Sequence, residues 1–285
     1  MMSAIMLTRR KFLALSAAAL PGIALAADDK HIPLGAQLYT VRQAAQADLP
    51  AALKQIRAIG YEEVELYWNV YRHPAETLRS MLKEAGLRAP SGHFNYEGFV
   101  AKVPYAQKLG VQWMVCPMLP KAQQNTLDGF HRAAHVFNRW GSLCKQHGMR
   151  FAFHNHNYEF QDFNGTTGYD VILKETDPDL VWLEMDTYWI TQAGRDPVLM
   201  LNQLGKRVRL LHLKDRNANV PTSQELNDAA SHFTEIGRGT LNMREILATA
   251  QRLGVEHYFV EQDESDKPFE SLKISYDALR HILPA

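Results

Sequence analysis

Along most of the chain, short apolar runs alternate with longer segments in which apolar residues recur every three or four positions. The first pattern is typical of buried strands and the second of amphipathic helices. A glycine stands at many of the junctions where a helical segment gives way to an apolar run, as at Gly60, Gly110 and Gly254. Glycine just past a helix end can adopt the left-handed conformation that closes the last turn. The sequence therefore predicts repeated helix-to-strand connections.

Eight strands are predicted in this way, at 32–39, 61–67, 87–93, 111–117, 149–155, 180–186, 206–213 and 255–261. Helical segments follow them, at 49–59, 74–85, 99–109, 126–147, 169–176, 197–204, 242–253 and 269–282. Eight alternating strand–helix units in about 260 residues are typical of an α/β fold of the (β/α)8 TIM barrel class, which we expect as a single domain over 27–285. A doubly wound sheet would usually carry a glycine-rich turn after the first strand, and this chain has none there.

Polar and ionisable residues gather where the predicted strands end. The carboxyl ends of TIM-barrel strands form the active-site face. An ionised group that faces a barrel interior must be paired or bind a metal, so chance is a poor explanation for repeated occurrences. The residues at these ends are Gln37, Tyr39, Glu65, His93, His154, His156, Glu159, Asp186, Trp189, His212, Lys214 and Glu261.

The richest of these segments is FAFHNHNYEF, residues 151–160. Side chains alternate along a strand, so His154 and His156 share one face. Imidazole and carboxylate groups together suit Mn²⁺, Zn²⁺ or Co²⁺, and suit Mg²⁺ less well. Each residue alone also has a structural explanation: Asp186, for example, could cap the next helix, and His212 could be a hydrogen-bonded core histidine. Their occurrence together on neighbouring strands favours one divalent metal site.

Eight motifs give the chain a resemblance to the xylose isomerase-like barrel family, often labelled sugar phosphate isomerase/epimerase. They are GAQLYTVR, GYEEVELY, SGHFNYE, FHNHNYEF, LEMDTYW, LLHLKD, EIGRGTLN and FVEQD. The resemblance implies a metal held by a glutamate, an aspartate, a histidine and a glutamate on the fifth to eighth strands. Asp186, His212 and Glu261 match three of these ligands. The fifth strand departs from the family pattern, and we assign Glu159 as the fourth ligand with His156 as its rival.

The resemblance also implies proton transfer beside the carbonyl of a sugar or polyol, assisted by the metal. Glu159, His154 or Glu261 would take the carbon-bound proton. Lys214 and Arg238 would hold a hydroxyl or a developing negative charge. The remaining candidates for substrate binding are Gln37, Tyr39, Glu65, His93, His156 and Trp189, and Trp68 and Phe94 are further aromatic candidates.

Three other functions are compatible with parts of this pattern. The first is a lyase or hydrolase that cleaves 3-keto-glycosides by β-elimination, because the same carbanion can expel a leaving group. The second is a sugar-binding barrel without turnover, against which the full set of ligands and acid–base groups argues. The third is a metal-dependent endonuclease, which the zero net charge disfavours. No dense cluster of Arg and Lys marks a phosphate site, so we expect an unphosphorylated substrate.

The first 26 residues read as a targeting signal rather than as part of the fold. Arg9-Arg10 forms a twin-arginine pattern, an apolar stretch follows at 13–25, and Ala24-Leu25-Ala26 fits a cleavage site. Pro21 and the short length argue against a membrane-spanning helix. We therefore expect export to the periplasm, no membrane insertion after processing and no nucleic-acid partner, while a homodimer and a Cys116–Cys144 disulfide both stay open.

Overall fold

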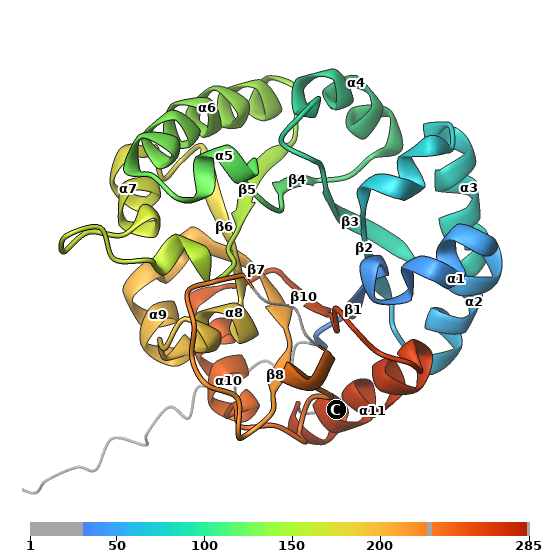
Figure 1. Ribbon diagram of the computed structural model, residues 1–285. Helices are drawn as coiled ribbons and strands as arrows, with labels where there is room; N and C mark the ends of the chain where they lie inside the picture. Colours follow the sequence, from blue (N-terminus) through green and yellow to red (C-terminus); the bar gives the residue numbers. More distant parts are fainter. Residues whose placement is uncertain (1–30, 227–229, 284–285) are drawn as a thin grey trace, which may run out of the picture. The chain divides into compact units, whose positions relative to one another are not determined.

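Eight parallel strands close into a barrel in the computed structural model, which describes residues 31–226 and 230–283 (Figure 1). Around the barrel the order is β1-β10-β7-β6-β5-β4-β3-β2, so each strand pairs with its neighbours in sequence and the last closes on the first. The predicted TIM barrel is confirmed, and the predicted signal at 1–26 lies outside the described residues. The strands are β1 Leu34–Gln37, β2 Glu63–Leu66, β3 Arg88–His93, β4 Trp113–Cys116, β5 Arg150–His154, β6 Val181–Asp186, β7 Val208–Leu213 and β10 His257–Val260.

Helices cover the outside of the barrel, with at least one after each strand (Figure 1). Their inner faces follow the helical period, as in α2, where Leu49, Ala52, Leu53 and Ile56 are buried. No helix in the described ranges is long and apolar enough to cross a membrane. The helices are α1 Arg42–Ala47, α2 Leu49–Ile59, α3 Ala75–Ala85, α4 Phe99–Leu109, α5 Lys121–Gln124, α6 Leu127–Gln146, α7 Gly168–Glu175, α8 Thr187–Gln192, α9 Pro197–Leu204, α10 Met243–Leu253 and α11 Pro268–Ile282.

Two glycines show why the junctions need this residue. Gly86 closes α3 with φ of 71°, and its N–H bonds to the carbonyls of Leu82 and Lys83. That left-handed conformation is strained for residues with a side chain. Gly35 of β1 serves another purpose, because a Cβ there would collide with the ring of Phe259 on β10. The first glycine ends a helix, and the second lets two barrel strands pack together.

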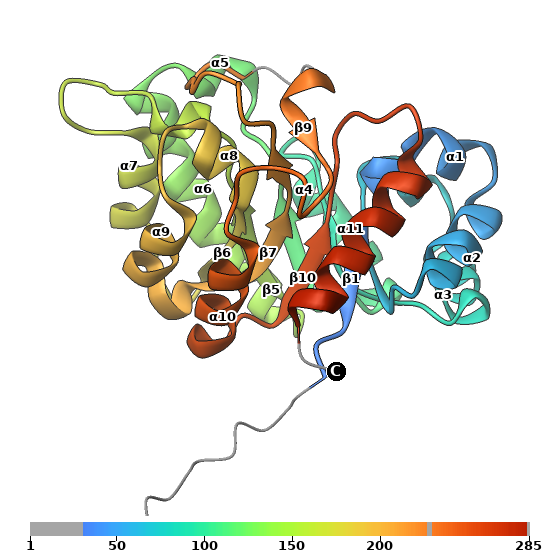
Figure 2. The same cartoon turned by 90° about the horizontal axis from the view of Figure 1, so that it is seen from below.

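The long segment after β7 is not wholly irregular. It contains a two-stranded antiparallel sheet, β8 Asp215–Arg216 and β9 Phe233–Thr234, at the end of the barrel to which the strands point (Figure 2). The carboxylate of Asp215 accepts hydrogen bonds from the backbone N–H groups of Gly237, Gly239 and Leu241, at 3.0 to 3.1 Å. One buried carboxylate therefore fixes the return of this segment toward α10.

Candidate active site

Side chains alternate between the inner and outer faces of the barrel strands. On the inner face, a layer of apolar side chains, here called the floor, lies below polar side chains nearer the carboxyl ends of the strands. On β7, Leu210 belongs to the floor, His212 lies two positions later, and Lys214 follows the strand end after two more. Residues two apart share a face of a strand, so these three side chains stack along the barrel axis. The floor is a separate buried cluster formed by Trp113, Val115, Ala152, Leu210 and Phe259.

Glu65 of β2 lies at the centre of the lower polar layer. Its Oε2 is 2.6 Å from Nε2 of His212 and 3.1 Å from Nε2 of His93. The same oxygen accepts a hydrogen bond from Gln37 at 2.6 Å, and the hydroxyl of Ser91 donates to Oε1. The side chain of Glu65 is fully buried. A buried carboxylate is stable only when it is paired and hydrogen-bonded in this way.

Glu184 of β6 is the second buried carboxylate of this layer. Its Oε2 lies 2.7 Å from Nε2 of His93, 3.2 Å from Nδ1 of His154 and 3.3 Å from Nε2 of His212. Its other oxygen, Oε1, is buried without a hydrogen-bond partner among the described residues. Three imidazoles from β3, β5 and β7 thus surround one carboxylate from β6.

The upper layer consists of Asp186, His212, Glu261, Lys214 and Asp263. Nδ1 of His212 is 2.8 Å from Oε2 of Glu261 and 3.8 Å from Oδ2 of Asp186. Nζ of Lys214 lies 3.1 Å from Asp186, 2.7 Å from Glu261 and 2.7 Å from Asp263. His212 therefore joins the two layers, with one ring nitrogen facing each.

Opposite charges set the protonation of the lower layer. Burial alone would lower the pKa of His93, but the carboxylates of Glu65 and Glu184 raise it to about 9. The pKa of His212 is also raised well above its usual value, because Glu184 and Glu261 outweigh burial. Burial opposes ionisation of Glu65, yet the two imidazoles hold its pKa below the usual value. The layer thus pairs the imidazolium rings of His93 and His212 with the carboxylate of Glu65 at neutral pH, whereas burial raises the pKa of Glu184 to about 7.

Lys214 is a permanent cation in the upper layer. Burial would lower its pKa, but Asp186, Asp263 and Glu261 raise it well above the usual value. Burial would raise the pKa of Glu261, and Lys214 and His212 reverse that effect and keep the group ionised. Lys214 is therefore unsuited to act as a base or nucleophile here, and suited to hold negative charge.

Two sets of side chains in the described ranges bring potential metal-ligand atoms within 4.8 Å of one another. One set is His93, His154, Glu184 and His212, and the other is Asp186, His212 and Glu261. Asp186 Oδ2 is buried and makes no hydrogen bond among the described residues, and its cationic neighbour is Nζ of Lys214 in an ion pair at 3.1 Å. Mixed imidazole and carboxylate donors fit Zn²⁺, Mn²⁺ or Co²⁺. The residues present are therefore consistent with a divalent metal.

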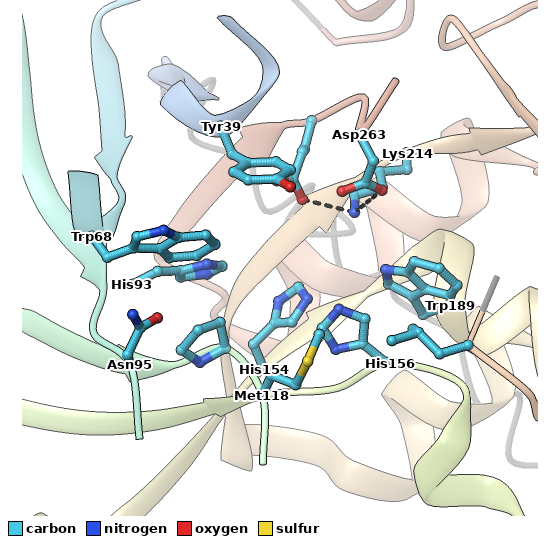
Figure 3. A pocket seen from close by; sticks show the side chains of 13 residues that line it. Tyr39, Trp68, His93, Asn95, Met118, His154, His156, Trp189, Lys214 and Asp263 are labelled. Carbon is cyan, nitrogen blue, oxygen red and sulfur yellow. Dashed lines mark hydrogen bonds and ion pairs between the residues drawn. The ribbon is translucent and has the colours of Figure 1, made fainter. Parts of the chain in front are cut away.

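These layers form the base of a pocket of about 440 Å³ (Figure 3). Tyr39 and Trp68 lie toward one end of the pocket and Trp189 toward the other. The lining residues are Tyr39, Trp68, His93, Asn95, Pro117, Met118, His154, His156, Trp189, Lys214, Leu226, Glu261 and Asp263. The predicted residues Gln37, Glu65, Asp186 and His212 do not line it and lie in the layers beneath.

Glu159 does not belong to the set of potential ligand atoms that Asp186, His212 and Glu261 form. It falls in the short 3₁₀ helix Tyr158–Phe160 after β5, and its Oε2 accepts the backbone N–H of His156 at 3.0 Å. Burial raises its pKa to about 8, so the carboxyl is mainly protonated at neutral pH. Its rival His156 lines the pocket, and its ring centroid is 5.1 Å from that of Trp189. Nδ1 of His156 is buried without a hydrogen-bond partner in the described ranges.

Arg238 and Phe94 also lie away from the pocket. Arg238 is exposed, pairs with Glu235 at 3.3 Å and lines a separate groove between α2 and α11. Phe94 is buried and stacks on Tyr71 with ring centroids 4.5 Å apart. Neither side chain is placed to contact a molecule in the pocket.

Sequence reasoning missed Glu184, Ser91 and Asp263 as members of the site. Glu184 could have been found, because it stands two positions before Asp186 on one strand and so shares its face. Asp263 lies beyond the end of β10, where alternation no longer applies. Cys116 and Cys144 are both buried as free thiols, with no disulfide between them.

The sequence model of the family described as xylose isomerase-like TIM barrel matches residues 53–283. An inosose dehydratase from Mesomycoplasma hyopneumoniae strain 7448 is 28% identical over 187 residues, which cover 58% of this chain and 61% of the relative. The chain thus spans less than two thirds of that relative's length. An inosose dehydratase from Lacticaseibacillus casei is 24% identical over 254 residues, which cover 77% of this chain and 84% of the relative. The crystal structure of a sugar phosphate isomerase/epimerase from Parabacteroides distasonis aligns with a TM-score of 0.74 at 25% identity. The alignment covers 92% of this chain and 98% of that chain.

Proposed function

The chain belongs to the xylose isomerase-like TIM barrel family, and on this premise we propose that it is a divalent-metal-dependent sugar isomerase or epimerase. It would transfer a proton next to the carbonyl of an unphosphorylated sugar or polyol. The observation that carries the proposal is the placement of Lys214 and Glu261 at the base of an aromatic-lined pocket, directly above His212 and Asp186. This arrangement brings candidate metal ligands, the ammonium group of Lys214 and the ionised carboxylate of Glu261 into one small volume.

Asp186, His212 and Glu261 would hold the metal, with His154 as the nearest group from β5. Nε2 of His154 is 4.0 Å from Oδ2 of Asp186. A bound divalent ion would supply Lewis-acid polarisation of a carbonyl or hydroxyl oxygen. Glu65 would keep His212 in place through Nε2, so that Nδ1 faces the upper layer.

The pocket residues would divide the remaining tasks. Glu261 is ionised and lines the pocket, so we assign it the removal of the carbon-bound proton. Lys214 would hold a substrate oxygen as negative charge develops on it. Burial lowers the pKa of His156 to about 3, so its ring is neutral and its buried nitrogen can exchange a hydrogen bond with a hydroxyl group. Trp68, Tyr39 and Trp189 offer apolar faces to sugar C–H groups.

An unphosphorylated substrate is the better match to the charges of this pocket. Lys214 is the single Lys or Arg among the described lining residues, and three carboxylates lie within 3.1 Å of its Nζ. A phosphate group would face that excess of negative charge. Export by the twin-arginine route, which we propose from the first 26 residues, is compatible with this choice, because neutral sugars and glycosides occur outside the cytoplasm.

One observation favours β-elimination as the second candidate function. Burial raises the pKa of Asp263, although Lys214 opposes the shift, and this carboxyl lines the pocket. Because this pKa is about 7, Asp263 is protonated in part of the molecules at neutral pH, and a carboxylic acid in that state can give its proton to a leaving hydroxyl or alkoxide. Loss of water from an inosose, as in the dehydratases named above, or of an aglycone from a 3-keto-glycoside, would follow from the same carbanion.

The deciding experiment is incubation of Mn²⁺-loaded protein in deuterated water with free aldoses, ketoses, inososes and 3-keto-glycosides, followed by NMR. Deuterium next to the carbonyl without bond cleavage would support the isomerase or epimerase, whereas release of water or an aglycone would support the eliminating enzyme. Glu261→Gln should abolish either reaction, and Glu256→Gln, a change at the opposite end of β10, should not. Sugar binding without exchange or cleavage in all three proteins would instead identify a sugar-binding barrel.

A further inference from the structure

Lys214 is held by the same atoms that the upper metal-ligand set offers. Its Nζ is 3.1 Å from Asp186 Oδ2 and 2.7 Å from Glu261 Oε2, and His212 Nδ1 is 2.8 Å from that same glutamate oxygen. The side chain of Lys214 is 2% exposed. The ammonium group is therefore enclosed within the ligand set and is not a solvated charge at its edge.

A metal and this ammonium group cannot occupy their places together. Carboxylate oxygens bind Zn²⁺ at about 2.0–2.2 Å. An ion that close to both oxygens would lie within a few ångströms of Nζ, in a buried environment where like charges repel strongly. The lone pairs of Asp186 Oδ2 and Glu261 Oε2 would also be shared between two cations. One of the two cations has to withdraw.

We propose that Lys214 is a tethered cation that exchanges with the divalent metal: it neutralises Asp186 and Glu261 until the metal enters, and then moves toward the pocket. This proposal rests on the metal site of the proposed function and adds a mechanism for its loading. Metal entry would then release the ammonium group, which already lines the pocket, from two of its three carboxylate partners, so that it is free to hold a substrate oxygen when the metal is bound.

Asp263 is placed to receive the displaced ammonium group. Its Oδ2 is already 2.7 Å from Nζ of Lys214, and the residue lines the pocket. It belongs to neither set of potential ligand atoms in the described ranges. Lys214 can therefore withdraw from Asp186 and Glu261 and keep one carboxylate partner throughout.

The test is the affinity of metal-stripped protein for Mn²⁺ and Zn²⁺, measured by isothermal titration calorimetry at constant pH. Lys214→Met should bind each metal at least tenfold more tightly than the wild type, because the competing cation is gone. Lys206→Met, which removes an exposed lysine just before β7, at the opposite end of that strand from Lys214, is the matched control and should bind as the wild type does. Equal or weaker binding by Lys214→Met would overturn the exchange.

A second variant keeps the test decisive if Lys214→Met does not fold. Asp263→Asn retains the lysine but weakens the group that receives it, so metal binding should become several-fold weaker, whereas the exposed control Asp266→Asn should not change it. Asp263→Asn with wild-type or tighter binding would contradict the exchange. Should the wild type bind neither metal, the metal site of the proposed function fails as well. The wild type could bind metal and catalyse deuterium incorporation while the metal affinities of Lys214→Met and Asp263→Asn do not shift as stated. In that case the proposed function stands, and only the exchange of Lys214 with the metal fails.

Discussion

Glu65 on β2 holds Nε2 of His212 on β7 at 2.6 Å across the barrel, although 147 positions separate the two residues in the sequence. This contact turns Nδ1 of the same ring toward Glu261 and Asp186. Carboxylate partners of metal-binding histidines fix the ring orientation and raise its basicity. The relationship makes Glu65 a positioning residue for the candidate metal site beneath the pocket.

Glu65→Gln should therefore lower the affinity for Zn²⁺ by about 10- to 100-fold. It should also destabilise the fold by about 3–5 kcal/mol, because it leaves charged imidazoles without their partner. Glu63→Gln is the matched control. Glu63 is an equally buried acid of β2 that pairs with His257 and Arg88 at the other end of the barrel, at 2.8 and 3.0 Å. It should reduce stability without altering metal affinity, and an equal loss of affinity in both variants would refute the positioning role.

We expect amide substitutions at Glu159 and at Asp186 to have different effects on metal affinity. Asp186 lies within the upper ligand set, so Asp186→Asn should reduce metal affinity by roughly 100-fold or more. Glu159 lies outside that set and its pKa is raised to about 8 by burial, so Glu159→Gln replaces a mainly neutral group with another. We expect the affinity of Glu159→Gln to stay within about twofold of the wild type. A large loss in Glu159→Gln would show that Glu159 moves into the site as the family pattern implies.

The lower layer should make the metal-stripped protein less stable as the pH rises above neutrality. The pKa of His93 is raised to about 9, so the folded state binds this proton more tightly than the unfolded state. Its stabilising contribution is complete below the unfolded pKa of about 6.5 and is lost as the pH rises through about 9. The shift corresponds to about 3 kcal/mol of unfolding free energy. Glu159, protonated in the fold up to about pH 8, adds a loss of the same sign.

Urea unfolding at a series of pH values between 6 and 10 measures this loss. His93→Gln should be less stable than the wild type at pH 6 and should show a much flatter decline with pH. Its stability should approach that of the wild type near pH 10, where the wild-type imidazolium is gone. A decline in His93→Gln as steep as in the wild type would assign the pH dependence to other groups.

The N-terminal pattern predicts export that depends on two arginines. Replacing both Arg9 and Arg10 with lysine keeps the charge but removes the pair that the twin-arginine route reads. The precursor should then stay in the cytoplasmic fraction, and the wild type should reach the periplasm shortened to a start near Ala27. Lys11→Arg leaves the pair intact and should be exported normally. Periplasmic protein in the double variant would show that another route is used.

The sequence alone was sufficient to predict the barrel, because the conformations of its helices, strands and junctions depend on nearby residues. Glycines such as Gly86 close helices because they tolerate the left-handed conformation, and the change of hydrophobic period marks where each strand begins. Alternation along β5 and β6 also places Ala152 with His154, and Glu184 with Asp186, on one face of each strand. These features depend on neighbours within a few positions, and for that reason they can be read directly.

Only the tertiary structure decided which inward groups meet and which strand-end groups leave the site. The pairing of Glu65 with His212 depends on closure of the barrel, which places β2 only three strand steps from β7 through β1 and β10, and no local pattern encodes it. Glu159 and Arg238 lie beyond strand ends, where turn geometry rather than a fixed period directs the side chain, and neither of them lines the pocket. Lys214 and Asp263 lie past the ends of β7 and β10, and only the folded barrel brings their side chains to 2.7 Å from each other.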